Sequence, residues 1–297
     1  MTFAELLTAA RKRLEKAGVD TPLLDAEVLL AHAAGVKRID LYTNRNESPA
    51  EKQIESFDSM IRRREERCPV AYITGTREFW SLEIRVNPEV LIPRPETELV
   101  VQRALAFLGD KGKDPEAVFD ILDLCTGSGC IAAALAHEIP GARLTVTDAS
   151  RRALCVAKEN LAFAEGRVRF LEGDLFEALR TAEDPSPAES GGSGLFDLIV
   201  SNPPYIPEKL LASLAPEICR HEPRGALNGG ESGLDFALRI IEDAVPFLKK
   251  GAALIMEIGS DQSAALARAV SNRRDYAGFS VSEDLSGMER VITAWKS

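Results

Sequence analysis

Cysteine and histidine are scarce in this 297-residue chain, and neither type is spaced as a metal site requires. There are five cysteines and three histidines, and no two cysteines form a C-x-x-C pair. Zinc sites and the disulfide frameworks of small secreted domains both depend on such regular spacing. We therefore expect a reduced, metal-free, cytoplasmic protein whose odd number of cysteines stay unpaired, at Cys68, Cys125, Cys130, Cys155 and Cys219.

Long apolar runs are also missing. No stretch approaches the ~18–20 apolar residues that a membrane-spanning helix needs. The first residues, MTFAELLTAARKRLEKAG, carry charges throughout and predict an amphipathic helix, not a secretory signal. We expect no membrane partner.

The chain has no excess of positive charge. Its net charge is −10, and residues 1–75 hold 12 basic and 12 acidic residues, so the rest of the chain carries the whole deficit. Proteins that grip a nucleic-acid backbone generally present a basic face. The local arginine cluster 62–67 lies in an amphipathic pattern with interleaved acids, and we interpret it as a solvated helix face. We expect no direct nucleic-acid partner.

Hydrophobic periodicity predicts three consecutive regions. Residues 1–70 show helical spacing only and predict a bundle of four or five helices. Residues 71–92 change to strand-like residues with turn signals and predict a β-hairpin linker. Residues 93–297 form the third region, and within it the Pro/Ser/Gly-rich segment 181–194 predicts a mobile loop.

From residue 118 onward, strand-like and helix-like segments alternate. Predicted strands end in ILDLCTGSG, LTVTDAS, RFLEGDLF, LIVSNPPY and LIMEIG, and residues 281–296 predict a closing hairpin. Such alternation is typical of an α/β fold, a doubly wound and mainly parallel sheet with helices on both faces. The carboxyl edge of that sheet is where a ligand is expected.

The turn after the first of these strands has the composition of a cofactor-binding loop. In DLCTGSGCIA, Gly127 and Gly129 remove side chains where a ligand would touch backbone, and the following helix offers free N–H groups. Cys125, Thr126 and Ser128 complete the segment. Ala132 occupies the last position of a G-x-G-x-x-G/A fingerprint, so a nicotinamide dinucleotide stays open as an alternative at this point.

Two acids follow at later strand ends. Asp148, 19 residues beyond Gly129, can accept both hydroxyls of an adenosine ribose; its alternative role is to cap the next helix. Asp174 ends the third strand, where it can accept the adenine amino group or serve as a cap or turn residue. The strand ends together predict an adenosine-bearing ligand along the sheet edge.

The NPPY sequence at Asn202, Pro203, Pro204 and Tyr205 makes the pattern specific. With the glycine turn and the acidic strand end, it resembles the S-adenosylmethionine-dependent amino-methyltransferases, whose targets are nitrogens conjugated to a planar π system. The Asn202 side-chain oxygen and the Pro203 carbonyl can accept the two hydrogens of such a nitrogen. The prolines hold these acceptors rigidly, and Tyr205 offers a flat face. The alternative is a turn that only terminates a buried strand.

Four longer segments narrow the resemblance. VLIPRPETELVVQRAL, DLCTGSGCIA, IVSNPPYIP and EPRGALNGGESGLDF resemble the release factor glutamine methyltransferases, the PrmC/HemK family, and the likeness covers essentially the whole chain. It implies methylation of the glutamine amide in the Gly-Gly-Gln motif of peptide chain release factors, with S-adenosylmethionine as cofactor. It also implies cofactor contacts from Cys125 to Gly129 and at Asp148, and a glutamine site from Asn202 to Tyr205, with Asn202 touching both ligands.

At two positions the chain departs from the family. The glycine turn of the family begins with Gly where this chain has Cys125, so we expect either its side chain to point away from the cofactor or its φ to be negative. An aromatic often follows the acid at position 174, where this chain has Leu175, which can still pack on adenine as an aliphatic wall.

Two other functions remain to be weighed. Nucleic-acid N6-adenine methyltransferases also carry NPPY-type motifs, but they are expected to have a basic target-recognition region that this chain lacks. A cofactor-binding regulator without chemistry would not need the acceptors of NPPY. We therefore expect a monomeric protein methyltransferase in which residues 1–70 dock the release factor.

Overall fold

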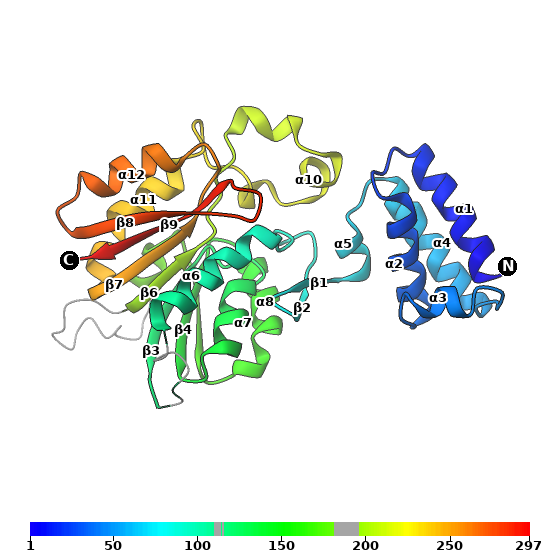
Figure 1. Ribbon diagram of the computed structural model, residues 1–297, viewed down its shortest axis with the longest axis horizontal. Coiled ribbons are helices and arrows are strands. Elements are labelled where there is room, and N and C mark those ends of the chain that lie inside the picture. Colours follow the sequence, from blue (N-terminus) through cyan, green and yellow to red (C-terminus); the bar gives the residue numbers. More distant parts are fainter. Residues whose placement is uncertain (110–113, 115, 181–195) are drawn as a thin grey trace. The chain divides into compact units, whose positions relative to one another are not determined.

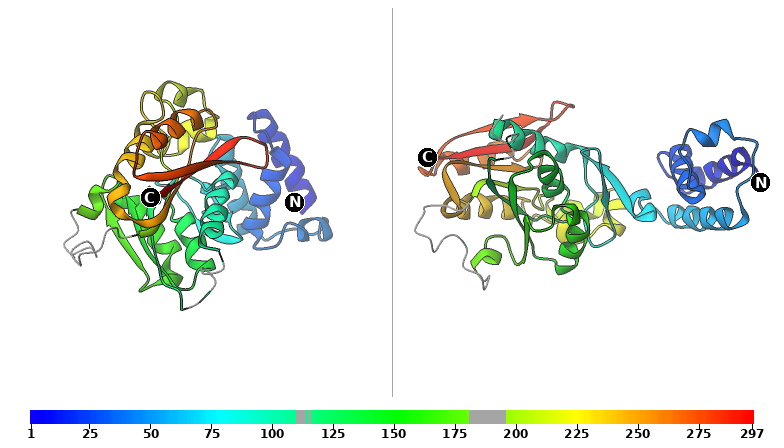
Figure 2. Two further views of the ribbon diagram at one scale, coloured as in Figure 1. Left: turned by 60° about the vertical axis from the view of Figure 1, so that its left-hand side comes forward. Right: turned by 90° about the horizontal axis from the view of Figure 1, so that it is seen from below.

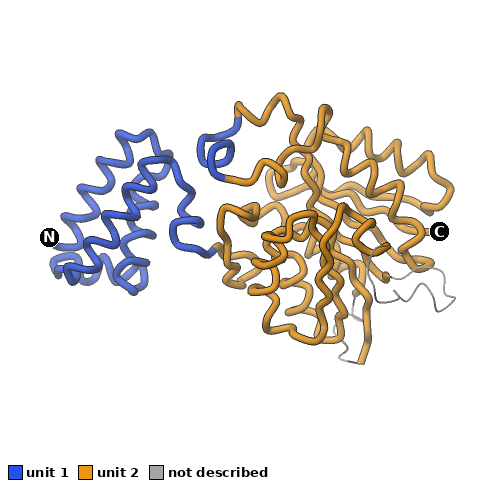
Figure 3. Tube along the Cα trace, turned by 180° about the vertical axis from the view of Figure 1, so that it is seen from behind, with its two compact units in different colours: residues 1–76, 214–221 blue, residues 77–213, 222–297 orange. Residues whose placement is uncertain are grey.

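The computed structural model describes residues 1–109, 114, 116–180 and 196–297 (Figure 1). By its contacts the chain divides into two compact units (Figure 3). The first comprises Met1–Thr76 and Leu214–His221, and the second comprises Arg77–Ser213 and Glu222–Ser297. The predicted mobile loop 181–194 lies outside the described residues. None of the helices in the described ranges is long and apolar enough to cross a membrane.

The first unit is a helical bundle around one apolar cluster. The capping box between Thr2 and Glu5 starts its first helix, and Gly35, in the left-handed conformation, ends the second. Apolar side chains at helical spacing, such as Leu14 and Ile61, are fully buried in this cluster. Its helices are α1 (Phe3–Lys16), α2 (Pro22–Ala34), α3 (Asp40–Thr43), α4 (Glu51–Glu65), α5 (Val70–Thr74) and α10 (Pro216–His221).

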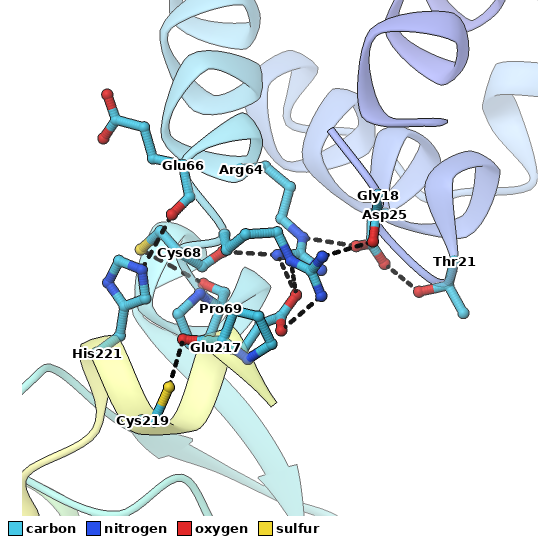
Figure 4. A network of polar contacts seen from close by, with 12 residues as sticks. Gly18, Thr21, Asp25, Arg64, Glu66, Cys68, Pro69, Glu217, Cys219 and His221 are labelled. Carbon is cyan, nitrogen blue, oxygen red and sulfur yellow. Dashed lines mark hydrogen bonds and ion pairs between the residues drawn. The ribbon is translucent and has the colours of Figure 1, made fainter. Parts of the chain in front are cut away.

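The arginine cluster at the end of α4 is not a uniformly solvated face. Arg62 is exposed, but the side chain of Arg64 is only 7% exposed and that of Arg67 14%. Both buried arginines pair with Glu217 of α10, and Arg64 also pairs with Asp25 of α2 (Figure 4). The interpretation as a solvated face is therefore wrong for these two residues, because the acids that neutralise them lie far away in sequence.

A short hairpin begins the second unit. Its strands are β1 (Thr76–Phe79) and β2 (Leu82–Arg85), and the residues just before it form α5 instead of extended chain. Trp80 and Ser81 form the turn with φ of 54° and 56°, the left-handed pair that tight hairpins prefer. The Trp80 backbone N–H donates to Glu98 and its indole N–H donates to Glu138, which fastens the turn to neighbouring helices.

The second unit is built on a seven-stranded sheet in the order β5-β4-β3-β6-β7-β9-β8. β3 to β7 run parallel, whereas β9 is antiparallel to both of its neighbours. The α/β, doubly wound and mainly parallel fold class is confirmed. The strands are β3 (Phe119–Leu124), β4 (Ala142–Asp148), β5 (Val168–Glu172), β6 (Phe196–Ser201), β7 (Leu248–Glu257), β8 (Tyr276–Glu283) and β9 (Glu289–Lys296).

Helices cover both faces of this sheet (Figures 1 and 2). The helices α6 (Glu98–Leu108), α7 (Cys130–Glu138) and α8 (Arg151–Asn160) contact one another in sequence order on one face. On the other face α11 (Asp235–Asp243) and α12 (Ser263–Ser271) contact each other and enclose an apolar cluster with alternate strand residues such as Leu122 and Leu124. A short helix, α9 (Glu177–Arg180), follows β5. The central strands are therefore buried on both faces, and their carboxyl ends are left for a ligand.

Candidate active site

A cavity of about 370 Å³ opens at the carboxyl ends of β3, β4, β5 and β6. Strand order reverses between β3 and β6, which is where open α/β sheets bind ligands. A volume of this order suits a small-molecule site. Of the predicted site residues, the following line the cavity: Cys125, Thr126, Ser128, Asp148, Asp174, Leu175, Asn202 and Pro204. Gly127, Gly129, Pro203 and Tyr205 adjoin them in the chain but are not among the lining residues.

The charged lining of the cavity is entirely acidic. Glu89, Asp148 and Asp174 line it, and no lysine, arginine or histidine does so among the residues that the structure describes. Carboxylates suit ligand hydroxyls, amino groups and cationic centres, whereas a pyrophosphate would face only like charge. The lining thus argues against the dinucleotide alternative that the glycine turn alone leaves open.

The glycine turn after β3 is left-handed at three positions. The φ angles are 57° at Cys125, 54° at Gly127 and 79° at Gly129. A Cβ at Gly127 would meet no atom within 4 Å, while one at Gly129 would lie 3.1 Å from the Cβ of Ala157 in α8. Gly127 therefore leaves open space in the turn, and Gly129 allows α7 and α8 to pack closely.

Cys125 keeps the backbone conformation of a glycine. Its positive φ excludes the expected alternative of a negative φ at this position. The side chain lines the cavity and packs against the apolar cluster on the α11/α12 face. Burial raises the pKa of the Cys125 thiol, with smaller contributions from the carboxylates of Asp148 and Asp123. The thiol is accordingly a neutral, packed group at this site.

Beneath the turn lies a buried acid, Asp123. It is fully buried, and its Oδ2 accepts a hydrogen bond of 2.7 Å from the Thr126 hydroxyl. Burial raises the pKa of Asp123 to about 7, although the bond from Thr126 opposes that rise. This bond directs the Thr126 hydroxyl towards the interior of the fold and helps to fix the conformation of the glycine turn.

Asp148 receives two backbone N–H groups at the end of β4. Its Oδ2 lies 2.9 Å from Gly127 N and its Oδ1 lies 2.8 Å from Ser150 N. Burial raises the pKa of this carboxyl, and the two backbone bonds oppose the rise. The cap of α8 is Ser150, whose hydroxyl accepts from Ala153 N. The helix-cap alternative for Asp148 is therefore wrong.

Asp174 and Leu175 follow β5 at the next position along the edge. Asp174 pairs with Arg239 at 2.6 Å, with both side chains 43% exposed. The Arg239 guanidinium also lies over the ring of Phe236, 6.0 Å from its centre, and Phe236 lines the cavity. Leu175 is 4% exposed with a φ of 47°. An aromatic wall is therefore present at this site from α11, although position 175 is aliphatic.

The NPPY segment after β6 is held by its polar side chains. Asn202 donates its Nδ2–H to Thr97 Oγ1 at 3.1 Å. Tyr205 donates its hydroxyl hydrogen to Glu257 Oε1, also at 3.1 Å. No hydrogen bond reaches Asn202 Oδ1 from the described residues, so the amide keeps this acceptor, beside the second of its two N–H groups, for a further partner.

The backbone of the same segment is packed against a glycine-rich loop. Gln262 donates from Nε2 to the carbonyls of Tyr205 and Gly233, at 2.9 and 3.0 Å. Gly233 has a φ of 80°, and a Cβ there would lie 2.4 Å from the Tyr205 oxygen. Only glycine fits so close an approach with this φ. The loop thus makes the NPPY turn rigid.

Several supporting residues were not singled out by sequence reasoning. Thr97, Phe236, Glu257 and Gln262 each touch the cavity lining or NPPY. Thr97 and Phe236 lie inside the segments that carry the family resemblance, which could have marked them as site residues. Glu257 and Gln262 lie at a strand end in MEIGSDQ, and the only sequence signal of a role at the site was the charged residue directly after an apolar run.

Comparison with known proteins gives two family models that match this chain. One, described as the PrmC N-terminal domain, matches residues 5–75, and the other, the methyltransferase small domain, matches residues 113–231. Relatives named release factor glutamine methyltransferase match over the full length. The one from Rhodopirellula baltica is 38% identical over 100% of this chain and 97% of its own, and the one from Moorella thermoacetica is 40% identical over 100% and 99%.

Solved structures with low sequence identity share the fold. The hMettl16 catalytic domain in complex with the MAT2A 3'UTR hairpin 6 has a TM-score of 0.54 at 16% identity, covering 85% of this chain and 86% of that one. The T. thermophilus 16S rRNA N2 G1207 methyltransferase, in complex with AdoMet and guanosine, has a TM-score of 0.50 at 19% identity, covering 75% and 50%. The fold is that of a methyltransferase.

Proposed function

Because the chain belongs to the release factor glutamine methyltransferase family, we propose that it methylates the side-chain amide nitrogen of the glutamine in the Gly-Gly-Gln motif of peptide chain release factors. The product is N5-methylglutamine. The observation that carries the proposal is the orientation of Asn202 at the cavity, where Nδ2 is bound to Thr97 and Oδ1 is free for a substrate N–H. Cytoplasmic location and a monomeric state are part of the proposal.

S-adenosylmethionine fits the cavity by its chemistry. Asp148, already positioned by two backbone N–H groups, accepts the ribose hydroxyls with its remaining lone pairs. Asp174 and the apolar walls of Leu175 and Phe236 hold the adenine. The residues from Cys125 to Gly129 border the methionine end, and the acidic lining favours a cation. When bound, this cofactor supplies an electrophilic methyl group on a sulfonium.

The residues of NPPY then handle the glutamine amide. An amide nitrogen is a poor nucleophile, because its lone pair is delocalised into the carbonyl. Asn202 Oδ1 and the Pro203 carbonyl accept its two hydrogens, which orients the nitrogen and favours the positive charge that develops on it. Tyr205 packs its ring against the planar amide. The transfer needs no dedicated general base, because the N–H proton of the amide nitrogen becomes acidic once that nitrogen is alkylated.

The runner-up is methylation of adenine in DNA or RNA, whose amino nitrogen could use the same acceptors. The net charge of −10 and the acidic cavity lining argue against a polyanionic substrate. An RNA-bound structure among those of similar fold does not favour it, because a likeness at 16% identity concerns the fold alone.

One assay tests the proposal. The protein is incubated with methyl-labelled cofactor and a purified release factor, and in parallel with DNA and with RNA. We expect label in the release factor alone, lost when the Gly-Gly-Gln glutamine is replaced by glutamate. Label in nucleic acid, or equal label in the release factor with that replacement, would overturn the proposed substrate.

A further inference from the structure

Glu222 is a buried acid that joins two separate segments of the second unit. Its side chain is 1% exposed. Its Oε1 accepts a hydrogen bond of 2.5 Å from Arg94 Nη2, and its Oε2 accepts one of 3.3 Å from Ile92 N. Burying a carboxylate is costly unless it is paired and hydrogen-bonded, and both oxygens of Glu222 are used in this way. The two donors lie 128 and 130 positions earlier in the chain.

Both segments joined by this acid border the cavity. Three residues line the cavity from each segment: Leu91, Pro93 and Thr97 from the first, and Pro223, Gly225 and Ala226 from the second. Glu222 and Arg94 are themselves not among the described residues that line it. The ion pair therefore holds two parts of the cavity lining together without facing a ligand.

The first segment carries the partner of the Asn202 side chain. Its short 3₁₀-helix, Pro95–Thr97, begins directly after Arg94, and Thr97 N donates to the Arg94 carbonyl at 3.1 Å. The Thr97 hydroxyl in turn accepts from Asn202 Nδ2 at 3.1 Å. Glu222 holds the side chain of Arg94, and the backbone of Arg94 holds the turn that presents this hydroxyl. A displacement of Arg94 would therefore move the group that orients the Asn202 amide.

The second segment pairs with the backbone that follows NPPY. Ile206 N donates to the Leu227 carbonyl at 3.0 Å, and Gly229 N donates to the Ile206 carbonyl at 2.9 Å. The short 3₁₀-helix Arg224–Ala226 lies between this pairing and Glu222 in the chain. Anchoring Glu222 therefore also limits how far the backbone next to NPPY can move.

We propose that Glu222 and Arg94 position NPPY for methyl transfer. Their ion pair joins the segment that presents the Thr97 hydroxyl to the segment that pairs with Ile206, and so holds NPPY from two sides. Both are positioning residues, because they act on the reacting groups only through others. This inference rests on the proposed function of NPPY. It adds that the geometry of the acceptors depends on a charge pair outside the cavity lining.

The test is single-turnover methyl transfer to a release factor at saturating cofactor and substrate. Arg94→Met keeps a long apolar stem but removes the guanidinium, whereas Arg94→Lys keeps a positive charge. The Arg94 side chain is 29% exposed, so the fold should accept both changes. We expect Arg94→Met to lower the rate roughly 10- to 100-fold, the cost of misplacing reacting groups, and Arg94→Lys to restore most of the rate. The dissociation constant of the cofactor and the melting temperature should stay nearly unchanged.

Glu222→Gln alters the other partner of the pair. A carboxamide has one oxygen, so its NH₂ group would face one of the two donors, and we expect a similar loss of rate. Asp120→Asn is the matched control. It also weakens an ion pair of the second unit, with Lys249, but Asp120 lies at the amino end of β3, away from the cavity. This control should transfer the methyl group at the wild-type rate.

A double-mutant cycle shows whether the two residues act together. If they do, Arg94→Met adds little to the loss already caused by Glu222→Gln. Fully multiplicative losses would overturn the inference, because each residue would then act alone. Equal rates in Arg94→Met and Arg94→Lys would also overturn it. If Glu222→Gln fails to bind the cofactor and is therefore not folded, the comparison of Arg94→Met with Arg94→Lys decides alone.

The failure of this inference is distinguishable from failure of the proposed function. Asn202→Ala is measured beside the other variants. A normal rate in Asn202→Ala would remove the role of the amide itself. A slow Asn202→Ala with normal rates in Arg94→Met and Glu222→Gln would leave the proposed function intact and contradict only the positioning role.

Discussion

The guanidinium of Arg67 meets the carboxylate of Glu217 in a two-pronged ion pair, although the two residues are 150 positions apart. Arg67 Nε lies 2.6 Å from Oε1 and Nη2 lies 2.8 Å from Oε2. Arg64 reaches the same carboxylate at 2.9 Å, and His221 contacts the Glu66 carbonyl (Figure 4). The segment 214–221, which follows NPPY in the chain, is thereby held within the helical unit.

We expect Glu217→Gln to destabilise the helical unit by about 1–3 kcal/mol, because two largely buried guanidinium groups lose their charged acceptor. Burial alone would raise the pKa of Glu217, but the hydrogen bonds from Arg67 and Arg64 prevail and lower it to about 2. The ionised Glu217 therefore contributes fully to the free energy of unfolding above the ordinary carboxyl pKa of 4.5. This contribution is lost as the pH falls towards the folded-state pKa of about 2.

Urea unfolding of the wild type and of Glu217→Gln at several pH values measures this loss of stability. The gap in stability between wild type and Glu217→Gln should be largest near neutral pH and should close in acid. Glu66→Gln is the matched control, since Glu66 is exposed and its carboxylate points away from the network (Figure 4). A gap that stays constant from neutral pH to pH 3 would contradict the ion-pair account.

The docking role of the helical unit also remains to be tested. Deleting residues 1–75 should spare cofactor binding, because every residue that lines the cavity belongs to the other unit. Methylation of a whole release factor should fall sharply. The deletion also removes Arg64 and Arg67, the partners of Glu217 in segment 214–221. Glu217→Gln in the full chain is therefore measured beside it, to separate loss of this contact from loss of the helical unit. Equal rates for the truncated and full-length enzymes would contradict a docking role.

Asp148→Ala should weaken cofactor binding by roughly 1.5–3 kcal/mol, the range for hydrogen bonds to a charged group. The carboxylate is oriented by Gly127 N and Ser150 N, so the loss concerns a preorganised acceptor. Isothermal titration calorimetry measures it. Asp197→Ala, at an acid of β6 that pairs with Lys249 and does not line the cavity, is a suitable control. Unchanged affinity in Asp148→Ala would remove the ribose assignment.

Cys125→Gly should stabilise the fold. A non-glycine residue in the left-handed conformation costs roughly 1–2 kcal/mol, and Cys125 has a φ of 57°. Glycine relieves that strain but gains freedom in the unfolded chain and loses the packing of the thiol. The net gain should therefore be below about 1 kcal/mol, visible as a small rise in melting temperature. Cys125→Ala, which retains a Cβ, should show no such gain.

The features that could be predicted from the sequence are those that can be recognised within a few consecutive residues. The glycine turn and NPPY each join a strand to a turn within a few residues, so their place at the sheet edge follows from the strand pattern alone. Glu217 and Glu257 could not be assigned in this way, because an isolated acid has no meaning until its partners are known. Their partners, Arg67 for Glu217 and Tyr205 for Glu257, lie 150 and 52 positions away.

Two helices were not assigned individually from the sequence. Segments 235–243 and 263–271, which form α11 and α12, were expected only as part of the general alternation of strands and helices. Conversely, residues 71–74 lie in α5 despite strand-like composition, since packing in the helical unit outweighs the local preference.

Asn202→Ala should abolish turnover far more than it weakens cofactor binding. The bond from the amide hydrogen to Oδ1 strengthens as the substrate nitrogen becomes positive, so its loss falls on the transition state. Removing one such preorganised group typically costs ~3–4 kcal/mol, or about 10²–10³-fold in rate. Single-turnover methyl transfer at saturating cofactor measures it, and a near wild-type rate would reduce Asn202 to a cofactor ligand.

Asn202→Asp sharpens the same test. Aspartate keeps an acceptor towards the substrate but has no Nδ2–H to donate to Thr97, so the bond that orients the side chain is lost. Its charge would also attract the sulfonium of the cofactor and tighten ground-state binding without assisting the transition state. We therefore expect unchanged or tighter cofactor binding together with a rate far below wild type. A variant that recovers the rate would show that any acceptor at this strand end suffices, and that the orientation imposed by Thr97 is not needed for transfer.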